Sequence, residues 1–350
     1  MNSLIQNCCA KIGKIFTGSN DIPVEYENNH IIHTQQFNPD WIDMIFGDAN
    51  SIWNMFKKGT IHRSLGHSLE GKRAFIIFTE PSTRTFYSFW IAAETLGMKC
   101  NPSENAKQIS SLVKGEPMSD MIEVLCQYYP SLIIMRQSQE GMMEIGAGIC
   151  DKYGVTLVNA GDGSNQHPTQ ALLDLYAIQR RFNRTTNLKI ILGGDLRYGR
   201  TIHSLAYLLA KYPGIEMYFV SPKELALPKN ITEYLDKHKV KYSVGEDFRH
   251  LKGWADVLYW TRVQVERIEN PEEKKRIEKA SERYVLSKND LSVLIGPESL
   301  IMHPLPIYTE VSREVDSDPR ALYKTLQVQG GLMIRTALIA RTFDIEIPRV

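Results

Sequence analysis

Residues 78–96, FTEPSTRTFYSFWIAAETL, decide how this sequence folds. The apolar run 74–78, which leads into this stretch, is typical of a buried strand. From residue 86 onward, apolar residues recur at helical spacings of three and four. Between them lies STRT, with Ser82 at the position of a helix N-cap. Backbone N–H groups of the first helical turn, three hydroxyls and one guanidinium converge there, which predicts a phosphate site. A capped helix with a surface arginine is the alternative that this stretch alone leaves open.

The composition is that of a globular protein with balanced charge. The chain has 350 residues, 43% hydrophobic and 23% charged, which is enough for two domains with substantial cores. Lys and Arg number 41 and Asp and Glu number 40, so the net charge is +1. We therefore expect no nucleic-acid partner, and we expect anions to be bound by a few locally placed basic groups.

The spacing of the cysteines and the length of the apolar runs indicate whether to expect a metal site, a membrane span or an oxidising compartment. None of the five cysteines stands at a metal-ligand spacing, so we expect no metal and a reducing, cytoplasmic setting. No apolar run approaches the length of a membrane span, so we expect no membrane contact. Residues 1–25 are predicted to be an N-terminal extension. One helical face of its first twenty residues is apolar. We favour a helix packed on the body of the protein, or a frayed terminus, over a targeting or docking helix.

Short apolar runs alternate with helical patterns from about residue 70 onward. This alternation is typical of an α/β fold in which parallel strands are covered by helices on both faces. The strand-like runs are 74–78, 132–135, 155–158, 189–192, 216–220, 257–259 and 300–302. The helical patterns include 121–129, 142–153, 169–182, 201–211 and 332–343. The charged segment 269–283 is predicted to be a solvated helix without chemistry.

We expect two domains, each a parallel β-sheet flanked by helices. The polar turn 183–187 (NRTTN) marks the boundary, so the first domain is 1–182 and the second is 183–325. The last helix, 332–343, follows Gly330-Gly331 and has one apolar side. We therefore expect residues 326–350 to return to the first domain.

Polar residues follow several predicted strands, at the sheet edge where ligands bind in open parallel sheets. Arg136 follows one strand, and His167 opens a helix, a position that favours a neutral imidazole. Taken alone, each residue leaves a simpler alternative open: a surface arginine for Arg136 and a lone capping histidine, which the local sequence favours, for His167. Arg200 and Arg262 follow strands of the second domain. With Arg84 and Arg136 in the first domain, they suggest a cleft for two anionic ligands, because guanidinium pairs carboxylates and phosphates through two parallel hydrogen bonds.

Two local patterns are weaker. The run GGDLRYGR at 193–200 lacks the G-x-G-x-x-G spacing, and no acidic residue ends the next strand, so a nicotinamide cofactor is not expected. The polar loop around Ser110 and Lys114 precedes a helix. Lys114 reaching into a cleft, its own or a neighbour's, and a solvent-exposed lysine are both open, and the local sequence favours the second.

Taken in order, these motifs resemble the aspartate/ornithine carbamoyltransferase family over roughly residues 30–345. The resemblance rests on PSTRT at 81–85, HPTQ at 167–170, GDLRYGRTIHSL at 194–205, TRVQ at 261–264 and HPLP at 303–306. The third, fourth and fifth motifs are similar to the aspartate branch of the family. The resemblance implies transfer of the carbamoyl group of carbamoyl phosphate to L-aspartate, a step of pyrimidine biosynthesis, with no cofactor.

The resemblance also implies a role for each matching residue. Phosphate is expected to be held by Ser82, Thr83, Arg84, Thr85 and Arg136. The carbamoyl carbonyl is expected to be polarised by Arg84, Thr85 and His167, with Gln170 and the Leu305 and Pro306 carbonyls orienting its amide nitrogen. The carboxylates of aspartate are expected on Arg200, Arg262 and Gln264. Ser110 and Lys114 are expected from an adjacent subunit of a homotrimer, and Glu80 is expected to brace Arg200 and Arg267.

Two positions depart from the family pattern, and three rival functions stay open. Phe86 and Ile307 stand where many members have Arg, which bears on domain closure, on affinity for aspartate or on the subunit interface. The rivals are a carbamoyltransferase with another amine acceptor, a non-catalytic relative and a nucleotide-binding α/β protein. The sequence also leaves open whether regulatory chains or a larger assembly surround the trimer.

Overall fold

The computed structural model describes residues 29–106 and 114–349, and the chain divides into two compact units. The first unit comprises Met1–Leu172 and Gln329–Val350, and the second comprises Leu173–Val328. The predictions for residues 1–25 and for Ser110 lie outside the described residues. Within the described ranges, no helix is long and apolar enough to cross a bilayer.

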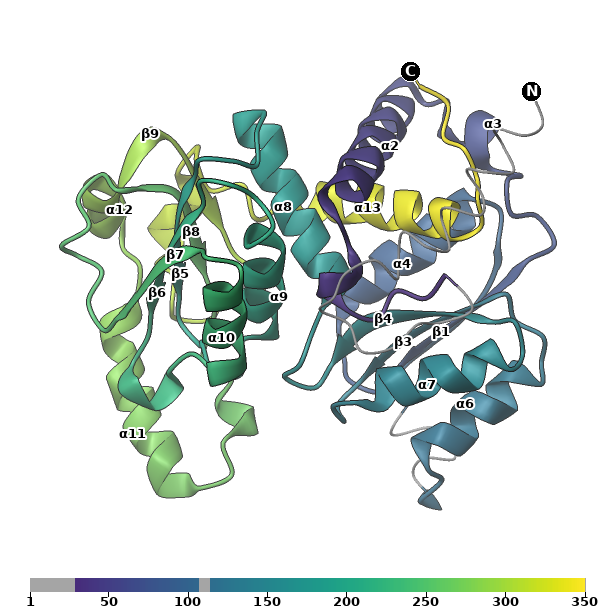
Figure 1. Cartoon of the computed structure of the whole chain (residues 1–350), viewed down its shortest axis with the longest axis horizontal. Coiled ribbons are helices and arrows are strands. Elements are labelled where there is room, and N and C mark those ends of the chain that lie inside the picture. The colour runs from purple at the N-terminus through teal and green to yellow at the C-terminus, as the bar shows by residue number, and fades with distance from the viewer. Residues whose placement is uncertain (1–28, 107–113, 350) are drawn as a thin grey trace. The chain divides into compact units, whose positions relative to one another are not determined.

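The first unit is built on a four-stranded parallel sheet in the order β2-β1-β3-β4. Its strands are β1 (Arg73–Phe78), β2 (Lys99–Glu104), β3 (Leu132–Gln137) and β4 (Thr156–Asp162). Helices α6 (Met118–Cys126) and α7 (Met142–Asp151) cover one face, and α4 (Thr83–Thr95) lies on the other (Figure 1). Because side chains alternate along a strand, Ile77 and Met135 join the α6–α7 core while Phe78 meets Phe86 of α4.

The remaining helices of the first unit are α2 (Pro39–Lys58), α3 (Ile61–Leu65) and most of α13 (Leu326–Thr342). The fully buried Asp48 carboxylate of α2 accepts hydrogen bonds from the Arg341 guanidinium of α13 at 2.5 and 3.0 Å. Arg335 of α13 donates to the Ser88 hydroxyl of α4 at 2.7 Å. The C-terminal helix therefore packs on the first unit, which confirms that part of the predicted fold.

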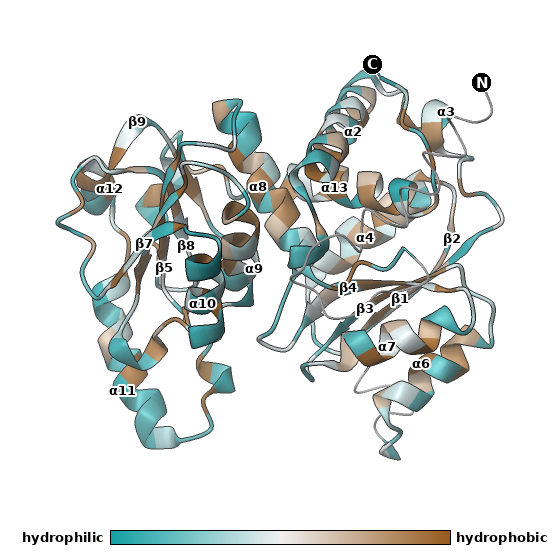
Figure 2. Cartoon of the chain, in the orientation of Figure 1, coloured by the Kyte–Doolittle hydropathy of each residue, from teal (hydrophilic) through white to brown (hydrophobic). Residues whose placement is uncertain are grey.

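The second unit contains a five-stranded parallel sheet in the order β7-β6-β5-β8-β9. Its strands are β5 (Lys189–Gly193), β6 (Glu216–Val220), β7 (Lys241–Gly245), β8 (Ala255–Trp260) and β9 (Ile295–Met302). Its helices are α9 (Arg200–Leu209), α10 (Lys229–Lys237), α11 (Pro271–Ser281), α12 (Lys288–Leu294) and most of α8 (Pro168–Phe182). The central strands are apolar, whereas α10 and α11 are largely hydrophilic (Figure 2). Parallel α/β architecture is thus confirmed in both units.

The sequence prediction was wrong at three elements, two edge strands and the last helix. It omitted β2 (KCNPSE) and β7 (KYSVG), which are edge strands with mostly exposed or half-buried side chains and therefore lack an apolar run. It also began the last helix after Gly330-Gly331, whereas α13 begins at Leu326 and passes through both glycines. Both glycines are buried, and tertiary packing outweighs a helix-propensity cost of about 1 kcal/mol each.

The predicted domain boundary lies at the C-terminal end of α8. The division into compact units falls earlier, within that helix. A helix that begins in one unit and ends in the other admits either boundary, so the limits 1–182 and 183–325 stay predictions.

Candidate active site

The first unit places the STRT turn where β1 ends and α4 begins. Ser82 is the N-cap residue, and the Phe86 N–H donates to its carbonyl at 2.9 Å, closing the first turn. The Ser82 hydroxyl makes no capping hydrogen bond to this turn, all of which the structure describes. The Ser82 N–H donates instead to the Glu104 carboxylate at 3.2 Å. The helix start thus keeps backbone donors, hydroxyls and a positive dipole end for an anion.

Arg136 lies beside this turn because β3 pairs with β1 in parallel. Phe78 at the end of β1 is in register with Arg136, whose carbonyl accepts hydrogen bonds from the Thr79 N–H and hydroxyl at 2.8 and 3.2 Å. The Arg136 Nε lies 3.7 Å from the Glu80 carboxylate. Arg84, on the first turn of α4, is exposed. Two guanidiniums therefore flank the same sheet edge.

His167 and Gln170 reach this edge from the end of β4. His167 is buried and immediately precedes α8, and its carbonyl accepts from the N–H groups of Gln170 and Ala171 at 3.0 and 3.2 Å. Because β1, β3 and β4 are parallel neighbours, their carboxyl ends share one edge. The structure thus brings Ser82–Thr85, Arg136, His167 and Gln170 to one side of the first sheet.

The loop before His167 is held by a buried carboxylate that sequence reasoning missed. Asp162 accepts hydrogen bonds from Asn159, Asn165 and the Gln166 N–H at 2.8 to 3.0 Å. Burial raises the pKa of Asp162, and these hydrogen bonds oppose the rise. The polar run DGSNQ carried the signal, since an Asp followed by turn residues commonly ties its own loop.

Lys114 is exposed and lies just before α6. Within its own subunit, none of the interactions that the structure describes ties it to the STRT turn. Its expected role therefore depends on the expectation of an adjacent subunit.

In the second unit, the turns after β5 and β8 are joined by Asp195. This carboxylate is fully buried and accepts from the Tyr198 N–H at 2.8 Å and the Gln264 N–H at 2.9 Å. The Asp195 N–H donates to the Thr261 hydroxyl at 3.1 Å. Burial raises the pKa of Asp195, opposed by backbone hydrogen bonds from Tyr198, Gln264 and Arg197. Sequence reasoning missed Asp195, although its place directly after a strand was a signal.

The predicted carboxylate-binding residues occupy these two turns. Arg200 begins α9 and is buried. The Arg262 guanidinium forms a two-bond pair with Glu266, whose hydrogen bond raises the pKa of Arg262. The Gln264 amide donates to the Tyr198 carbonyl at 2.6 Å. The structure thus brings Arg200, Arg262 and Gln264 to adjoining loops at the carboxyl edge of the second sheet.

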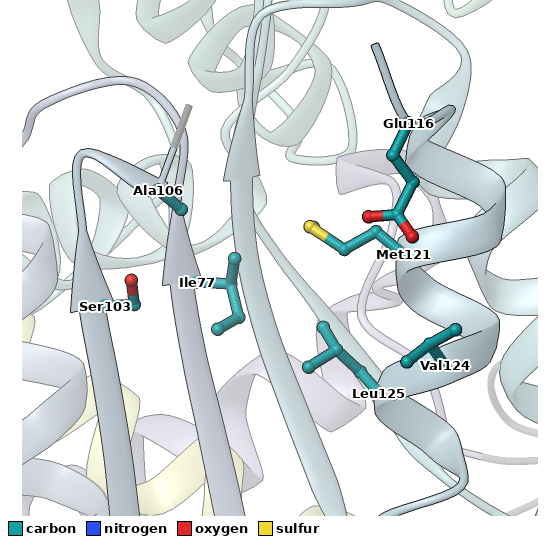
Figure 3. A pocket seen from close by; sticks show the side chains of 7 residues that line it. All are labelled: Ile77, Ser103, Ala106, Glu116, Met121, Val124 and Leu125. Atoms are coloured by element: carbon teal, nitrogen blue, oxygen red, sulfur yellow. The ribbon is translucent and has the colours of Figure 1, made fainter. Parts of the chain in front are cut away.

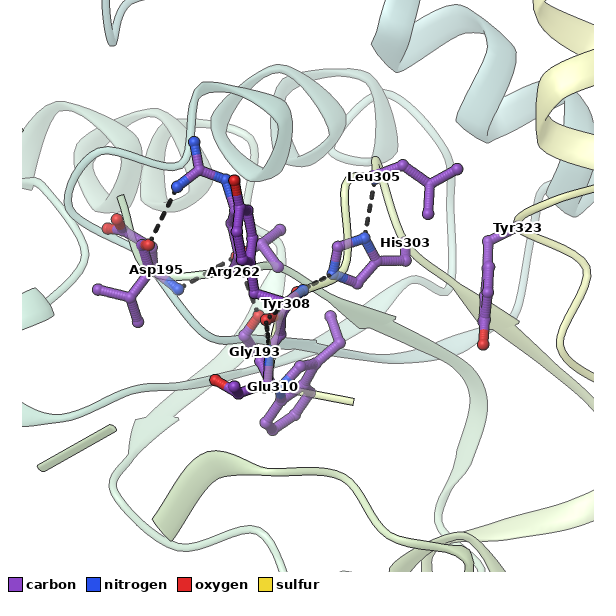
Figure 4. Close-up of polar contacts among 12 residues, drawn as sticks. Gly193, Asp195, Arg262, His303, Leu305, Tyr308, Glu310 and Tyr323 are labelled. Carbon is purple, nitrogen blue, oxygen red and sulfur yellow. Dashed lines mark hydrogen bonds and ion pairs between the residues drawn. The ribbon is translucent and has the colours of Figure 1, made fainter. Parts of the chain in front are cut away.

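The turn after β9 completes this edge. The Leu305–Pro306 peptide bond is cis, and Leu305 has a φ of 58°. The Leu305 N–H donates to His303 Nδ1 at 2.8 Å, and His303 Nε2 lies 2.9 Å from the Glu310 carboxylate (Figure 4). The Arg262 guanidinium lies 5.6 Å from the centre of the Tyr308 ring. Glu310 and Tyr308 were not predicted from the sequence.

A cavity of about 190 Å³ in the first unit lies away from these residues. It is formed by Ile77 of β1, the end of β2 and α6, with Met121 and Leu125 among its lining (Figure 3). Its surface is mostly apolar, and it contains none of the predicted site residues. Within the described residues, no group of three or more His, Cys, Asp or Glu side chains is placed to hold a metal ion.

Two family profiles match this chain. Residues 29–180 match "Aspartate/ornithine carbamoyltransferase, carbamoyl-P binding domain", and residues 186–342 match "Aspartate/ornithine carbamoyltransferase, Asp/Orn binding domain". The chloroplastic aspartate carbamoyltransferase of Oryza sativa subsp. japonica is 40% identical over 311 residues, covering 88% of this chain and 83% of the relative. The aspartate carbamoyltransferase catalytic subunit of Methanosarcina mazei is 39% identical over 320 residues, covering 91% and 98%.

Solved structures agree. The catalytic subunit of Methanocaldococcus jannaschii aspartate transcarbamoylase superposes with a TM-score of 0.77 at 38% identity, covering 90% of this chain and 98% of that one. Trypanosoma cruzi aspartate transcarbamoylase in complex with N-(phosphonacetyl)-L-aspartic acid superposes with a TM-score of 0.81 at 29% identity, covering 90% and 95%.

Proposed function

We propose how the two units divide the chemistry, on the premise that this chain belongs to the aspartate/ornithine carbamoyltransferase family, as the matches over 29–180 and 186–342 show. The chain transfers the carbamoyl group of carbamoyl phosphate to the amine of L-aspartate, giving N-carbamoyl-L-aspartate and phosphate. Relatives named for aspartate favour this acceptor over another amine. The observation that carries the assignment is the gathering of the STRT turn, Arg136 and His167 on one sheet edge.

The first unit supplies the phosphate half-site, by which we mean Ser82–Thr85, Arg136, His167 and Gln170. The phosphate accepts from the first turn of α4 and pairs with the Arg84 and Arg136 guanidiniums. His167, Thr85 and Arg84 donate to the carbamoyl oxygen, where negative charge develops in the transition state. Gln170 orients the carbamoyl amide.

The second unit supplies the groups that we call the second-unit half-site: Arg200, Arg262, Gln264 and the Leu305 and Pro306 carbonyls. Guanidiniums of Arg200 and Arg262 pair with the two carboxylates of aspartate, helped by the Gln264 amide. For Arg262 this pairing competes with its bond to Glu266. The Leu305 and Pro306 carbonyls accept from the carbamoyl amide nitrogen.

The reaction is a direct carbamoyl transfer. The neutral amine of aspartate attacks the carbamoyl carbon, a tetrahedral oxyanion forms, and the bond to the phosphate oxygen breaks. The departing phosphate takes the proton that the amine loses. The protein contributes by holding two mutually repelling anions among fixed cationic groups and by directing donors at the oxyanion.

A homotrimer with shared active sites is part of the proposal. Helix α4, whose start forms the phosphate half-site, exposes Tyr87 (49%) and Ile91 (43%), with the Trp90 ring stacked on Tyr87. An apolar face beside the site suits a neighbouring subunit that brings Ser110 and Lys114. Mixing inactive Lys114→Ala and Arg84→Ala chains should restore activity, because hybrid trimers contain intact shared sites. Absence of restored activity in mixed trimers would contradict sharing. A regulatory chain or larger assembly would show as added mass beyond a trimer in native mass spectrometry.

A cytoplasmic location is also proposed. Cys100, Cys126 and Cys150 are free thiols, as expected in a reducing compartment. Fractionation of cells that express the full chain would test this location, since recovery in an organelle would contradict it.

Arg84→Ala is the main test of the proposed function. Arg84 is exposed, so the variant should keep its melting temperature, whereas N-carbamoyl-L-aspartate formation should fall by roughly 10²- to 10³-fold or more, since a cationic donor to the transition state is lost. Arg63→Ala, an exposed arginine of α3, is the matched control. Near-normal turnover of Arg84→Ala would contradict the assignment, and labelled carbamoyl phosphate offered with other amino acids tests the rival acceptors.

A further inference from the structure

The His303 ring has both nitrogens engaged, and their partners define which one carries the proton. Nδ1 faces the backbone N–H of Leu305 at 2.8 Å, and Nε2 faces the Glu310 carboxylate at 2.9 Å (Figure 4). A backbone N–H only donates, so Nδ1 is the acceptor and Nε2 carries the hydrogen that is donated to Glu310. The ring is buried, so water cannot readily replace either partner.

Glu310 holds the other end of the same turn. Its carboxylate accepts from the Tyr308 and Thr309 N–H groups at 3.1 and 3.0 Å, in addition to His303. Burial opposes ionisation of Glu310, but the hydrogen bond from His303 and those of the turn outweigh it and lower the pKa of Glu310. One charged group thus ties the chain on both sides of Pro306 and Ile307.

The turn carries two groups that the proposed function uses. Leu305 and Pro306 present carbonyls for the carbamoyl amide, and Tyr308 lays its ring against the Arg262 guanidinium. His303 accepts from the N–H of Leu305, a residue that presents one of these carbonyls. Glu310 accepts from the N–H of Tyr308, the residue that supplies the ring.

We propose that His303 and Glu310 are positioning residues for both substrates. His303 fixes the carbonyls of Leu305 and Pro306 through its Nδ1, and Glu310 fixes the Tyr308 ring against Arg262. Neither residue touches the reacting atoms. The inference rests on the proposed function, because the roles of the two carbonyls and of Arg262 belong to it.

A second histidine with the same arrangement provides a matched control. His30 Nδ1 accepts from the Leu157 N–H at 2.8 Å, and its Nε2 lies 3.0 Å from the Asp151 carboxylate. These contacts join residues before α2 to β4 and α7, and none of the described partners belongs to either half-site. Substitutions at His30 therefore remove a comparable buried hydrogen-bonded ring without removing a proposed positioning contact.

Asparagine and glutamine separate the two contacts of His303. In His303→Asn the amide oxygen takes the place of Nδ1 and still accepts from Leu305. In His303→Gln the amide nitrogen reaches Glu310, but the Leu305 acceptor is lost. We expect kcat/KM for carbamoyl phosphate to fall by roughly 10- to 100-fold in His303→Gln, the usual consequence of leaving one buried donor unpaired, and by clearly less in His303→Asn.

The experiment measures steady-state kinetics and melting temperature on the full chain. His30→Asn and His30→Gln should lower the melting temperature and leave kcat/KM unchanged. Glu310→Gln preserves the shape of the side chain but weakens one charged hydrogen bond, so it should raise KM for aspartate by roughly tenfold. This variant tests the inference if His303→Gln does not fold.

Equal kinetic losses in His303→Asn and His303→Gln, or normal kinetics in folded His303→Gln and Glu310→Gln, would overturn the positioning roles while leaving the proposed function intact. If the unsubstituted chain formed no N-carbamoyl-L-aspartate, the proposed function would fail, and this inference would fail with it.

Discussion

The two half-sites are built in different ways. The phosphate half-site begins from one continuous turn, in which a helix start and its flanking side chains form the anion site locally. The second-unit half-site comes from three separate turns after β5, β8 and β9. The buried Asp195 joins the first two, and the pair His303–Glu310 holds the third. The difference teaches that the STRT turn depends mainly on residues that touch the ligand, whereas the second-unit half-site, like the His167 loop that Asp162 holds, also depends on buried residues that do not.

The largest expected effect on stability comes from a substitution at Gly194, in the turn after β5 of the second-unit half-site. This glycine has a φ of +105°, and a Cβ there would lie 2.1 Å from the Thr261 carbonyl oxygen. Gly194→Ala should lower the free energy of unfolding by roughly 3 kcal/mol or more, since a backbone clash adds to an unfavourable φ. Hydrogen exchange read peptide by peptide should show the loss in β5 and β8.

Gly71→Ala in the first unit is the matched control for Gly194. It shares a positive φ of +83°, but a Cβ there meets nothing within 4 Å. It should cost only about 1–2 kcal/mol, the ordinary penalty of a left-handed residue. Equal costs for the two variants would show that the close approach of Gly194 to the Thr261 carbonyl adds nothing to the cost of its positive φ.

Asp195→Asn should separate the half-sites functionally. The amide retains one acceptor oxygen and turns an N–H group toward a backbone donor, so either Tyr198 or Gln264 loses its partner. We expect KM for aspartate to rise by roughly 10- to 100-fold, from about 1–3 kcal/mol of lost support, while stabilisation of the chain by inorganic phosphate stays unchanged. Kinetics and thermal shift measure the two quantities.

Asp256→Asn is the control for Asp195. Asp256 also accepts a backbone hydrogen bond, from the Lys189 N–H at 2.8 Å, but at the amino end of β5, where no proposed ligand lies. It should leave KM for aspartate unchanged. A similar rise in KM for both variants would contradict a specific role of Asp195.

The same contrast explains what the sequence predicted. Motifs on one local turn, such as STRT before α4 and His167 before α8, were placed correctly because a strand followed by a capped helix is a local pattern. Two partners of Asp195, Gln264 and Thr261, lie in another segment of the chain, and this pairing depends on strand order, which periodicity does not encode. The Glu310 carboxylate meets His303 only through the irregular turn after β9, whose path periodicity does not encode either. The polar edge strands β2 and β7 were missed for a related reason. Each is held in its sheet by pairing with a neighbouring strand and has no apolar run that would mark it in the sequence.

Acid should destabilise the first unit through two histidines, the buried His30 and the partly buried His33. Burial lowers the pKa of His30 and of His33 below the ordinary value of about 6.5, so the unfolded state binds more protons just below that pH. Stability is therefore fully present above about pH 6.5 and falls as pH drops from that value toward the lowered folded pKa. At pH 5.5 the loss should reach at most about 1.4 kcal/mol for each histidine.

Unfolding free energies at pH 7.5 and 5.5, compared between the unsubstituted chain and His30→Gln, measure this effect. The variant should start from a lower stability and lose less of it on acidification, and hydrogen exchange should place the difference in β4 and α7. An unchanged pH dependence would show that His30 does not take up a proton on unfolding.

The smallest expected effect on stability belongs to Ser82→Ala. An N-cap normally contributes about 1 kcal/mol through its side chain, but the Ser82 hydroxyl makes no such bond to the described first turn of α4. Asn38 does cap α2, accepting from the Trp41 N–H at 2.9 Å, so Asn38→Ala is the matched control. We expect only a few tenths of a kcal/mol from Ser82→Ala and about 1 kcal/mol from Asn38→Ala.

For phosphate binding, we expect Ser82→Ala to have the larger effect and Asn38→Ala the smaller. Ser82→Ala should weaken it by roughly tenfold, because one hydrogen bond to a charged ligand is lost, whereas Asn38→Ala should leave it unchanged. If Ser82→Ala instead destabilised the chain as much as Asn38→Ala and left phosphate binding intact, Ser82 would be an ordinary helix cap. The phosphate half-site would then rest on the backbone donors and guanidiniums alone.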